Sequence, residues 1–336
     1  MTDRYDFASD TTAGMAPEAL AALVAANDGF AAGYGDDQVT RRAADLLRGW
    51  LDTDAEVRFV ASGTGANAIA LSALCRPFEA ALAHEHAHVR GPEAGAPGFF
   101  GQGLAIRALS GGSGRIDPHA LAAALAEEED PHHQPPAALS LTQATEFGAV
   151  YGEPQLAELI GQAQAAGLKV HLDGARLANA VAAGFDPTAP ARLGVDLLVV
   201  GGTKAGMAPT EALVILDKSL ARRFDARLKQ AGQLPSKGRF RAAPWIGMLE
   251  SGALGERAAH ANAMAKTLAA LSSFPVVHPV EANSVFVALD QARLDALHAL
   301  GWHVYRVEDG SVRFMCSWAT TQAAVEELAE VLRALA

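Results

Sequence analysis

Short apolar runs alternate along most of this chain with longer segments of helical periodicity. The expected strands lie at residues 56–62, 137–143, 169–174, 195–202 and 211–217. Helical spacing of apolar residues marks the segments 17–26, 38–51, 68–74 and 153–167. Strands that alternate with helices pair in parallel, because each crossover helix returns the chain to the same end of the sheet. The pattern therefore predicts an α/β fold whose large domain holds a mostly parallel sheet flanked by helices.

The pattern changes after about Trp245. An alanine-rich segment at residues 252–274 is expected to form one long helix, and short strands are expected within 284–290 and 311–318. A second, smaller α/β domain accounts for this change. We expect a large domain over residues 1–245 and a small C-terminal domain over residues 246–336.

Composition excludes several classes of function. The chain has 336 residues, of which 50% are hydrophobic, and a formal net charge of −11. A nucleic-acid-binding protein concentrates Lys and Arg on one face, so neither DNA nor RNA is expected as a partner. The first residues lack the basic and apolar pattern of a secretion signal, and no apolar run approaches the roughly 20 residues of a membrane span. We therefore expect a cytoplasmic protein with no membrane partner.

The sequence predicts neither a disulfide framework nor a metal site. Cys75 and Cys316 have no metal-ligand spacing and are interpreted as small buried hydrophobic residues. His132 and His133 stand in an acidic, proline-rich stretch that is typical of a solvated surface connection.

A glycine-rich loop follows the first expected strand and precedes a helical segment. Gly63, Gly65 and Ala68 fit the pattern G-x-G-x-x-A, and Glu85 follows about 20 residues later, as in a dinucleotide-binding unit. A nicotinamide-dependent dehydrogenase is therefore one candidate. A looser interpretation is that backbone N–H groups, the Thr64 hydroxyl and a helix N-terminus bind a single phosphate. A purely structural turn is the third alternative.

Two charged residues lie at the ends of other expected strands. Asp173 stands near the end of the run 169–174, and Lys204 follows the run 195–202, where parallel sheets collect their ligand groups. Together with a phosphate-binding loop they form the set that pyridoxal phosphate needs. The lysine amine forms a Schiff base, and the carboxylate holds a proton on the pyridine nitrogen. A nicotinamide enzyme would have no use for either residue.

Each of these residues also has a structural explanation when it is taken alone. A lysine after a strand is most often a surface residue, and Asp173 could cap the helical segment that follows it, with Arg176 as its counter-charge. The glycines that precede Thr203 and Lys204 favour the functional interpretation, since they let the backbone approach a cofactor closely. The combination is much less expected by chance than any one of its parts.

A resemblance to a known family rests on seven segments in order: FASDTTAG, GYGDDQVT, SGTGAN, HAHVRGPEAGAP, HLDGARLANA, GGTKAGM and VRFMCSW. From about Phe7 to Thr321 the chain resembles the low-specificity L-threonine aldolases, which are pyridoxal-phosphate enzymes of the aspartate-aminotransferase fold, fold type I. HLDGARLANA together with SDTT and GYGDD is specific to this group, whereas the glycine loop alone is not. The resemblance implies that fold, that cofactor and a small amino-acid substrate.

The resemblance implies a role for each matched position. The expected catalytic residues are the Schiff-base lysine, the partner of the pyridine nitrogen and a histidine stacked on the cofactor ring: Lys204, Asp173 and His88. The expected cofactor-binding set adds Gly63, Thr64, Arg176 and Thr203. The expected substrate-binding residues are Ser9, Tyr34, Arg176 and Arg313, the last from the small domain. His84 and His86 have no counterpart and are interpreted as structural or solvated.

The implied reaction cleaves threonine, allo-threonine and related β-hydroxy-α-amino acids to glycine and an aldehyde in a retro-aldol step. A guanidinium fork that grips the substrate carboxylate in two places fixes its rotation, and this orientation selects the bond at Cα that breaks. His88, or a water that it positions, would be the base. Another β-eliminating lyase on the same scaffold, a nicotinamide dehydrogenase and a non-catalytic binding protein are the alternatives.

One position departs from the family. Some members have a histidine that meets the substrate hydroxyl where this chain has Glu146, which could accept the same hydrogen bond and leaves threo or erythro selectivity open. Tyr34 and one of Lys229 and Lys237 would reach a neighbouring subunit if the family arrangement holds. The resemblance therefore implies a homo-oligomer, a dimer of dimers, with active sites at the dimer interface.

Overall fold

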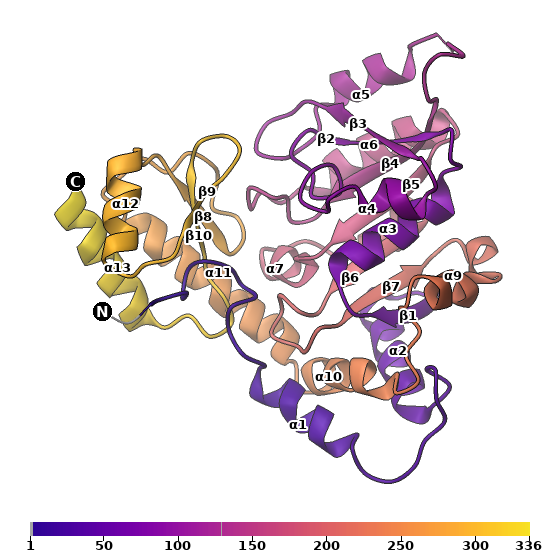
Figure 1. Ribbon diagram of the computed structural model, residues 1–336, viewed down its shortest axis with the longest axis horizontal. Coiled ribbons are helices and arrows are strands. Elements are labelled where there is room, and N and C mark those ends of the chain that lie inside the picture. Colours follow the sequence, from indigo (N-terminus) through magenta and orange to yellow (C-terminus); the bar gives the residue numbers. More distant parts are fainter. Residues whose placement is uncertain (1–2, 129) are drawn as a thin grey trace.

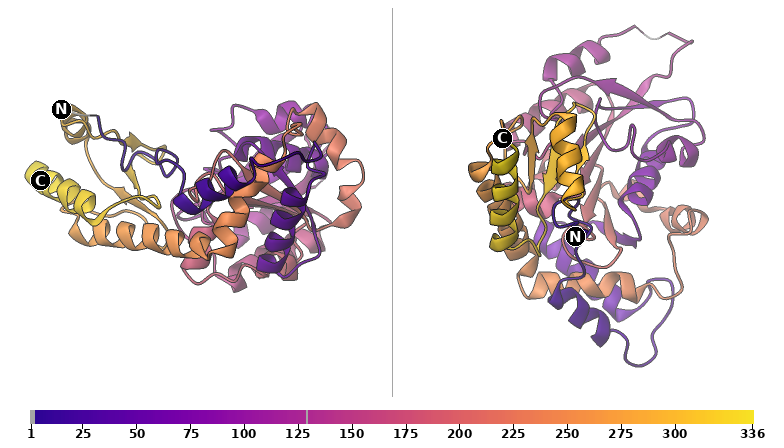
Figure 2. Two further views of the ribbon diagram at one scale, coloured as in Figure 1. Left: turned by 90° about the horizontal axis from the view of Figure 1, so that it is seen from below. Right: turned by 60° about the vertical axis from the view of Figure 1, so that its left-hand side comes forward.

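The computed structural model describes residues 3–128 and 130–336, which contain two separate sheets (Figures 1 and 2). The larger sheet has seven strands in the order β1-β7-β6-β5-β4-β2-β3. β7 is antiparallel to both of its neighbours, and every other pairing is parallel. The strands are β1 (Glu56–Val60), β2 (Ala80–His84), β3 (Ala105–Leu109), β4 (Pro136–Thr142), β5 (Lys169–Gly174), β6 (Leu197–Gly201) and β7 (Glu211–Ile215).

Helices cover both faces of this sheet, because its strands carry apolar side chains on both sides. Along β6, Leu198 and Val200 join one apolar cluster, and Leu197 and Val199 join the cluster on the opposite face. The first face is covered by α2 (Gln38–Leu51), α5 (Pro118–Leu125), α6 (Glu153–Ala165), α7 (Leu177–Ala182), α8 (Ala189–Leu193) and α10 (Arg239–Glu250). The second face is covered by α3 (Gly63–Leu74), with α4 (Ala96–Phe100) packed against it, the short 3-10 helix η1 (Lys218–Ala221) and α9 (Phe224–Gln230).

The second sheet is small and antiparallel, with the order β8-β10-β9. It consists of β8 (Ser284–Val287), β9 (Tyr305–Arg306) and β10 (Val312–Met315), and it packs with α11 (Ala253–Leu271), α12 (Gln291–Ala299) and α13 (Gln322–Leu335). The N-terminal segment completes this unit, since Phe7 is buried in its core and the Phe7 carbonyl accepts a 2.9 Å hydrogen bond from the Met315 N–H.

The same N-terminal segment then continues into the larger unit. It leads to α1 (Pro17–Ala25), which lies along α10, as Figure 1 shows. Gly247 of α10 permits this close approach, because a Cβ atom there would lie 2.1 Å from the Glu18 carbonyl oxygen. The segment between Phe7 and α1 is thereby fixed at both ends.

The expected α/β architecture is confirmed, and the expected strands of the large domain correspond to β1, β4, β5, β6 and β7. β2 and β3 were not predicted. β2 reads AALAH and is entirely buried, so it shows neither β-propensity nor alternation of apolar and polar residues. The predicted division after residue 245 falls within α10 and stays a prediction. None of the helices in the described part of the chain is long and apolar enough to cross a membrane.

Gly247→Ala is expected to lower the free energy of unfolding by about 1–3 kcal/mol, because the added methyl group would collide with the backbone of α1. Gly255→Ala in α11 is the matched control, since no heavy atom outside its own helix lies within 4 Å of the added Cβ. This control is expected to gain about 0.5–1 kcal/mol from helix propensity. Thermal unfolding measures both, and equal effects of the two substitutions would contradict the packing of α1 on α10.

Candidate active site

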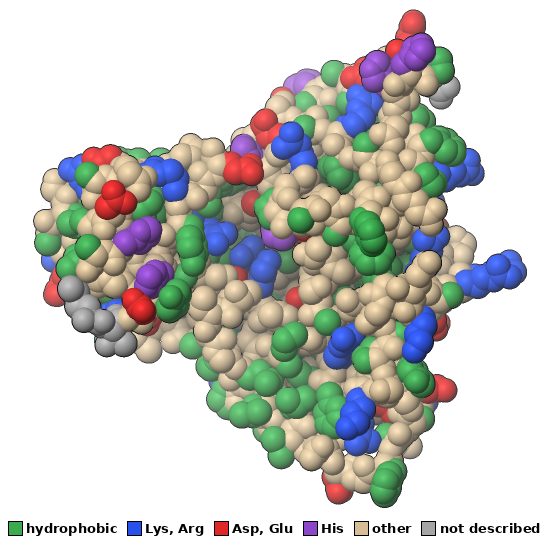
Figure 3. All heavy atoms as spheres, in the orientation of Figure 1, with side chains coloured by type: hydrophobic (Ala, Val, Ile, Leu, Met, Phe, Trp, Pro, Cys, Tyr) green, Lys and Arg blue, Asp and Glu red, His purple; other side chains and the backbone are tan. Residues whose placement is uncertain are grey.

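Charged side chains from both units gather at the carboxyl ends of the central strands. The Lys204 ammonium interacts electrostatically with four charged side chains: Arg176, Asp10, Asp173 and Glu211. Figure 3 shows a hollow between the two units with Lys or Arg side chains inside it. Parallel sheets bind their ligands at this edge, so the cluster is the candidate active site.

Lys204 lies in the turn that follows β6. Gly201 brings this turn close to the one after β5, because a Cβ atom at Gly201 would lie 2.1 Å from the Ala175 carbonyl oxygen. No hydrogen bond or ion pair of the Lys204 ammonium is found within residues 3–128 and 130–336. Burial lowers the pKa of this ammonium, and the positive Arg176 lowers it further. An amine with a lowered pKa is more often neutral and therefore more nucleophilic.

Asp173 is buried near the end of β5 with both carboxylate oxygens engaged. Oδ1 accepts a 2.9 Å hydrogen bond from the Ala175 N–H, and Oδ2 accepts one of 2.8 Å from Asn67 Nδ2. Asp173 does not cap the following helix, since the N-cap residue of α7 is Arg176. The structural alternative for Asp173 therefore does not hold, and its carboxylate is fixed in direction beside Lys204.

The glycine-rich loop forms the N-terminus of α3. Ser62 caps this helix by accepting a 3.2 Å hydrogen bond from the Gly65 N–H. The N–H groups of Gly63 and Thr64 have no partner among the described residues, and the space around Gly63 is open. Free N–H groups and the positive end of a helix dipole are a binding site for a phosphate. Thr203 is bonded within its own turn, where its Oγ1 accepts a 3.1 Å hydrogen bond from the Thr210 N–H.

These features fit pyridoxal phosphate. An unpartnered, half-buried lysine amine can meet its aldehyde, an oriented aspartate can meet its ring nitrogen, and the free N–H groups of α3 can meet its phosphate. The dinucleotide interpretation of the same loop is wrong. In that fold the strand before Glu85 would lie next to the strand before Gly63, whereas β2 and β1 are separated by β4, β5, β6 and β7.

Arg176 and Arg313 both contact the N-terminal segment. Arg176 binds Asp10 in two places, at 2.7 Å and 3.1 Å. Burial alone would raise the pKa of Asp10, but the positive Arg176 and Lys204 lower it overall. Ser9 is adjacent, with its Oγ 2.9 Å from Thr11 Oγ1.

Arg313 has no carboxylate partner among the described residues. Its Nη2 donates a 3.4 Å hydrogen bond to the Ala8 carbonyl oxygen, and its buried Nε has no partner. Burial lowers the pKa of this guanidinium, and the nearby Arg176 lowers it further. A half-buried cation without an anionic partner is suited to an anionic ligand group.

His88 lies between two buried carboxylates. Its backbone N–H donates a 2.9 Å hydrogen bond to Glu146 Oε1, and its Nδ1 lies 3.0 Å from Glu93 Oε1. Glu146 Oε1 also accepts a 3.0 Å bond from Thr142 Oγ1, whereas its buried Oε2 has no partner. Burial raises the pKa of Glu146 despite the hydrogen bond from His88.

The neighbouring histidines are engaged elsewhere. His84 Nε2 lies 3.2 Å from the Gly111 carbonyl oxygen, and His86 Nδ1 lies 2.9 Å from Glu308 Oε2 in the small unit. No group of three or more His, Cys, Asp or Glu side chains in the described part of the chain is placed to hold a metal ion.

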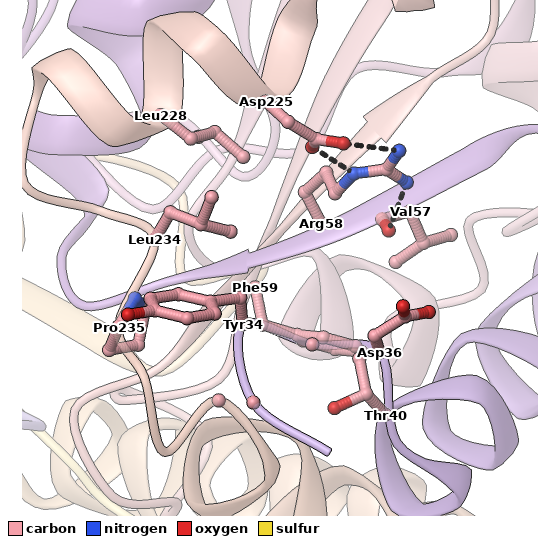
Figure 4. Close-up of a pocket in the computed structure, with 13 residues that line it drawn as sticks. Tyr34, Asp36, Thr40, Val57, Arg58, Phe59, Asp225, Leu228, Leu234 and Pro235 are labelled. Carbon is pink, nitrogen blue, oxygen red and sulfur yellow. Dashed lines mark hydrogen bonds and ion pairs between the residues drawn. The ribbon is translucent and has the colours of Figure 1, made fainter.

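Tyr34 is not part of the cluster around Lys204. It is 53% exposed and lines a separate cavity of 520 Å³ beside β1 and α9. Figure 4 shows this cavity with Arg58, which pairs with Asp225, on one side and the Tyr34 ring on another. Lys229 Nζ lies 4.5 Å from the centre of that ring. Within one chain the structure therefore keeps Tyr34 away from the other expected site residues.

Sequence reasoning missed several residues of the site. They are the side chains that hold the expected ones in place: Asp10, Asn67, Glu93, Glu211 and Asn283. Three of them lie inside segments that carried the family resemblance: Asp10 in SDTT, Asn67 in SGTGAN and Glu93 in HAHVRGPEAGAP. Glu211 begins β7 and accepts a 2.7 Å hydrogen bond from the Gly202 N–H, next to the turn of Lys204.

Comparison with known proteins gives consistent matches along the chain. The model of the beta-eliminating lyase family matches residues 6–292. A curated low-specificity L-threonine aldolase from a Pseudomonas species is 44% identical over 345 residues, covering 100% of this chain and 99% of that protein. The protein of the same name from Pseudomonas aeruginosa is 44% identical over 343 residues, with 99% of each covered.

Solved structures agree with this match. A threonine aldolase from Leishmania major has a TM-score of 0.92 and 31% identity, covering 99% of this chain and 100% of that one. A serine palmitoyltransferase from Sphingomonas wittichii shares the fold alone, with a TM-score of 0.71, 15% identity, and coverage of 99% of this chain and 86% of that one. The expected fold type I architecture is confirmed.

Glu211→Gln is expected to stabilise the protein more at pH 8 than at pH 5. Burial raises the pKa of Glu211 to about 7 from an ordinary value of 4.5. Between the unfolded pKa of 4.5 and the folded pKa of about 7, Glu211 is protonated in the folded chain but ionised in the unfolded chain. Ionisation of Glu211 therefore destabilises the fold as the pH rises. The gain from the substitution should grow by about 2–3 kcal/mol between pH 5 and pH 8.

Thermal unfolding at both pH values measures this gain. Glu250→Gln is the matched control, because Glu250 pairs with Arg42 at the surface. Its effect is expected to be the same at both pH values. If Glu211→Gln changes the stability by the same amount at pH 5 and pH 8, the raised pKa of the buried Glu211 carboxyl group is contradicted.

Proposed function

The chain belongs to the beta-eliminating lyase family and, within it, to the low-specificity L-threonine aldolases, and from this premise we propose that it cleaves threonine and related β-hydroxy-α-amino acids to glycine and an aldehyde. The observation that carries the proposal is the placement of an unpartnered lysine, an oriented aspartate and an unpaired arginine around one hollow. These are Lys204, Asp173 and Arg313.

The cofactor of this family is pyridoxal phosphate, and the residues of this chain can hold each of its polar groups. The amine of Lys204 would bind the aldehyde, Asp173 would bind the pyridine nitrogen, and the N–H groups of Gly63 and Thr64 would bind the phosphate. Once bound, the cofactor supplies an electron sink for the pair that is released when a bond at Cα breaks. Asn67 fixes the orientation of the Asp173 carboxylate by its 2.8 Å hydrogen bond.

Arg313 grips the substrate carboxylate. The buried Nε of Arg313 has no hydrogen-bond partner. Arg176, which Asp10 holds in place, adds further positive charge nearby. Ser9 borders the same space. Two-point binding of the carboxylate fixes the rotation about the bond to the amino group, so that the Cα–Cβ bond is the one that breaks.

His88 takes the proton of the β-hydroxyl group as that bond breaks. The hydroxyl oxygen then becomes the carbonyl oxygen of the released aldehyde, and Cα gains a proton to give glycine. The imidazole is 42% exposed, which leaves it accessible from the hollow. Glu146 binds the His88 backbone N–H through Oε1 and has an unpartnered Oε2, and its raised pKa lets it either donate or accept a hydrogen bond at the hydroxyl.

The enzyme works as a homo-oligomer in this proposal. Tyr34 has a φ of 60° and projects at the surface with Lys229 over its ring, which suits a contact with a neighbouring copy. The described cysteines, Cys75 and Cys316, are both free and buried, which supports a reducing compartment such as the cytoplasm.

Cofactor-loaded protein incubated with L-threonine is expected to release glycine and acetaldehyde in equal amounts, and so is protein incubated with L-allo-threonine. The ratio of the two rates measures the selectivity at Cβ of an enzyme that has Glu146 at this position. Chromatographic product analysis distinguishes the alternative. Ammonia with a keto acid in place of glycine would assign the chain to the β-eliminating reaction of the same family.

Lys204→Ala is expected to remove the covalent link to the cofactor and to lower the cleavage rate by about 10³-fold or more. Visible absorbance after removal of free cofactor measures the link, and the wild-type protein should stay yellow. Lys218→Ala is the control, because Lys218 pairs with Asp54 at the surface. Retention of the colour in the Lys204 variant would refute the assignment of the lysine.

A further inference from the structure

We propose that Glu93 is a positioning residue that holds the imidazole of His88 in a single tautomer and, through Asn67, ties it to Asp173. The proposal deepens the proposed function, because it explains how His88 presents a basic nitrogen to the substrate. Glu93 and Asn67 themselves have no contact with substrate or cofactor in the proposed function.

Three separate parts of the chain supply this network. Glu93 lies in the loop between β2 and α4, Asn67 lies in α3, and Asp173 lies in β5. Glu93 Oε1 accepts from Asn67 Nδ2 at 2.8 Å and lies 3.0 Å from His88 Nδ1. The second N–H of Asn67 reaches Asp173 Oδ2 at 2.8 Å. One unbroken set of hydrogen bonds therefore connects the imidazole with the expected partner of the cofactor ring.

The chemistry of Asn67 determines the charges in this network. Its amide nitrogen faces two carboxylate oxygens, one from Glu93 and one from Asp173. An amide turned by half a rotation would place Oδ1 against the same two oxygens, where neither side could donate. The arrangement thus fits two ionised carboxylates, each of which accepts one N–H.

The tautomer of His88 follows from the ionised state of Glu93. A carboxylate can only accept, so Nδ1 of His88 must carry the proton of that hydrogen bond. In the neutral imidazole the lone pair then belongs to Nε2. The described residues offer Nε2 no hydrogen-bond partner, and the ring is 42% exposed whereas the Glu93 side chain is fully buried. The buried carboxylate therefore turns the basic nitrogen toward the hollow.

The surroundings of Glu93 explain why a carboxylate suits this task better than an amide. Its second oxygen, Oε2, is buried without a partner. A glutamine would keep one acceptor oxygen for Asn67 and His88 but would place a new N–H₂ group where no acceptor is found. An alanine would leave both donors without an acceptor. Glutamate, glutamine and alanine at position 93 therefore form a series in which the positioning of His88 becomes progressively weaker.

The first experiment determines the tautomer of His88 in the cofactor-loaded enzyme without substrate. Protein with ¹⁵N-labelled histidine reports the protonation of Nδ1 and Nε2 by NMR, and His88→Asn identifies the signal. The wild-type enzyme is expected to show the proton on Nδ1. Glu93→Ala is expected to shift His88 toward the other tautomer, and Glu93→Gln should give an intermediate result. An Nε2–H tautomer in the wild-type enzyme, or a signal unchanged in Glu93→Ala, would overturn the proposal.

Cleavage kinetics give the second readout. Glu93→Ala is expected to lower kcat by about 10- to 100-fold, which is at most the lower end of what a general base contributes because His88 itself remains, with KM nearly unchanged. Glu93→Gln should recover most of this loss and guards against a variant that fails to fold. A KM effect with kcat unchanged would instead place Glu93 in substrate binding and reject the positioning role.

Two further variants separate the halves of the network. Asn67→Ala keeps the contact between Glu93 and His88, so the tautomer should stay while cofactor affinity falls by about tenfold, because Asp173 loses one of its two donors. Glu308→Ala is the matched control, since Glu308 binds His86 two residues from His88. It should leave the His88 signal unchanged, and an equal effect there would reject the local mechanism.

The two proposals can fail independently. A wild-type enzyme that releases no glycine but carries the proton on Nδ1 of His88, with the expected response to Glu93→Ala, would refute the reaction and retain the positioning role. An enzyme that forms glycine but whose His88 tautomer is unchanged in Glu93→Ala would retain the reaction and refute the positioning role.

Discussion

The buried ion pair between Arg176 and Asp10 is the interaction on which the site depends. Arg176 follows β5 of the large sheet, Asp10 belongs to the N-terminal segment, and Asn283 Nδ2, just before β8 of the small sheet, donates a 3.0 Å hydrogen bond to the same carboxylate. Three distant parts of the chain therefore meet at one buried charge. Loss of either partner would leave the other charge buried alone, which costs about 3–5 kcal/mol.

The charges around the hollow are balanced unequally. Arg176 is neutralised by Asp10 and Asp173 is bonded to Asn67, but Lys204 and Arg313 have no anionic partner in contact among the described residues. Burial of an unpaired cation is unfavourable, and its cost is relieved when an aldehyde or a carboxylate binds. The two positively charged side chains without an anionic partner therefore lie where the proposed cofactor and substrate attach, and binding lowers their electrostatic free energy.

Sequence reasoning succeeded where a residue and its neighbours in the chain determine the structure. The apolar runs before Asp173 and Lys204 predicted β5 and β6, and with them the place of both side chains. It failed where partners come from distant segments: nothing local in the sequence pairs Glu93 with Asn67. The strand β2 was missed because its alanines are buried by helices that only the folded chain brings together. The position of Tyr34 relative to a site depends on a second copy of the chain, which no local pattern describes.

The antiparallel strand β7 explains how Lys204 comes to be held so close to the sheet. A parallel successor to β6 would carry the chain away through a crossover helix, whereas β7 returns directly and pairs with β6 from Gly201↔Glu211 onward. Both ends of the turn are thereby fixed, and the Glu211 side chain fastens it again at the Gly202 N–H. A lysine in an ordinary crossover loop would move freely and lie in water, where its amine stays charged. The single reversal in the sheet thus provides both the position and the burial that make this amine reactive.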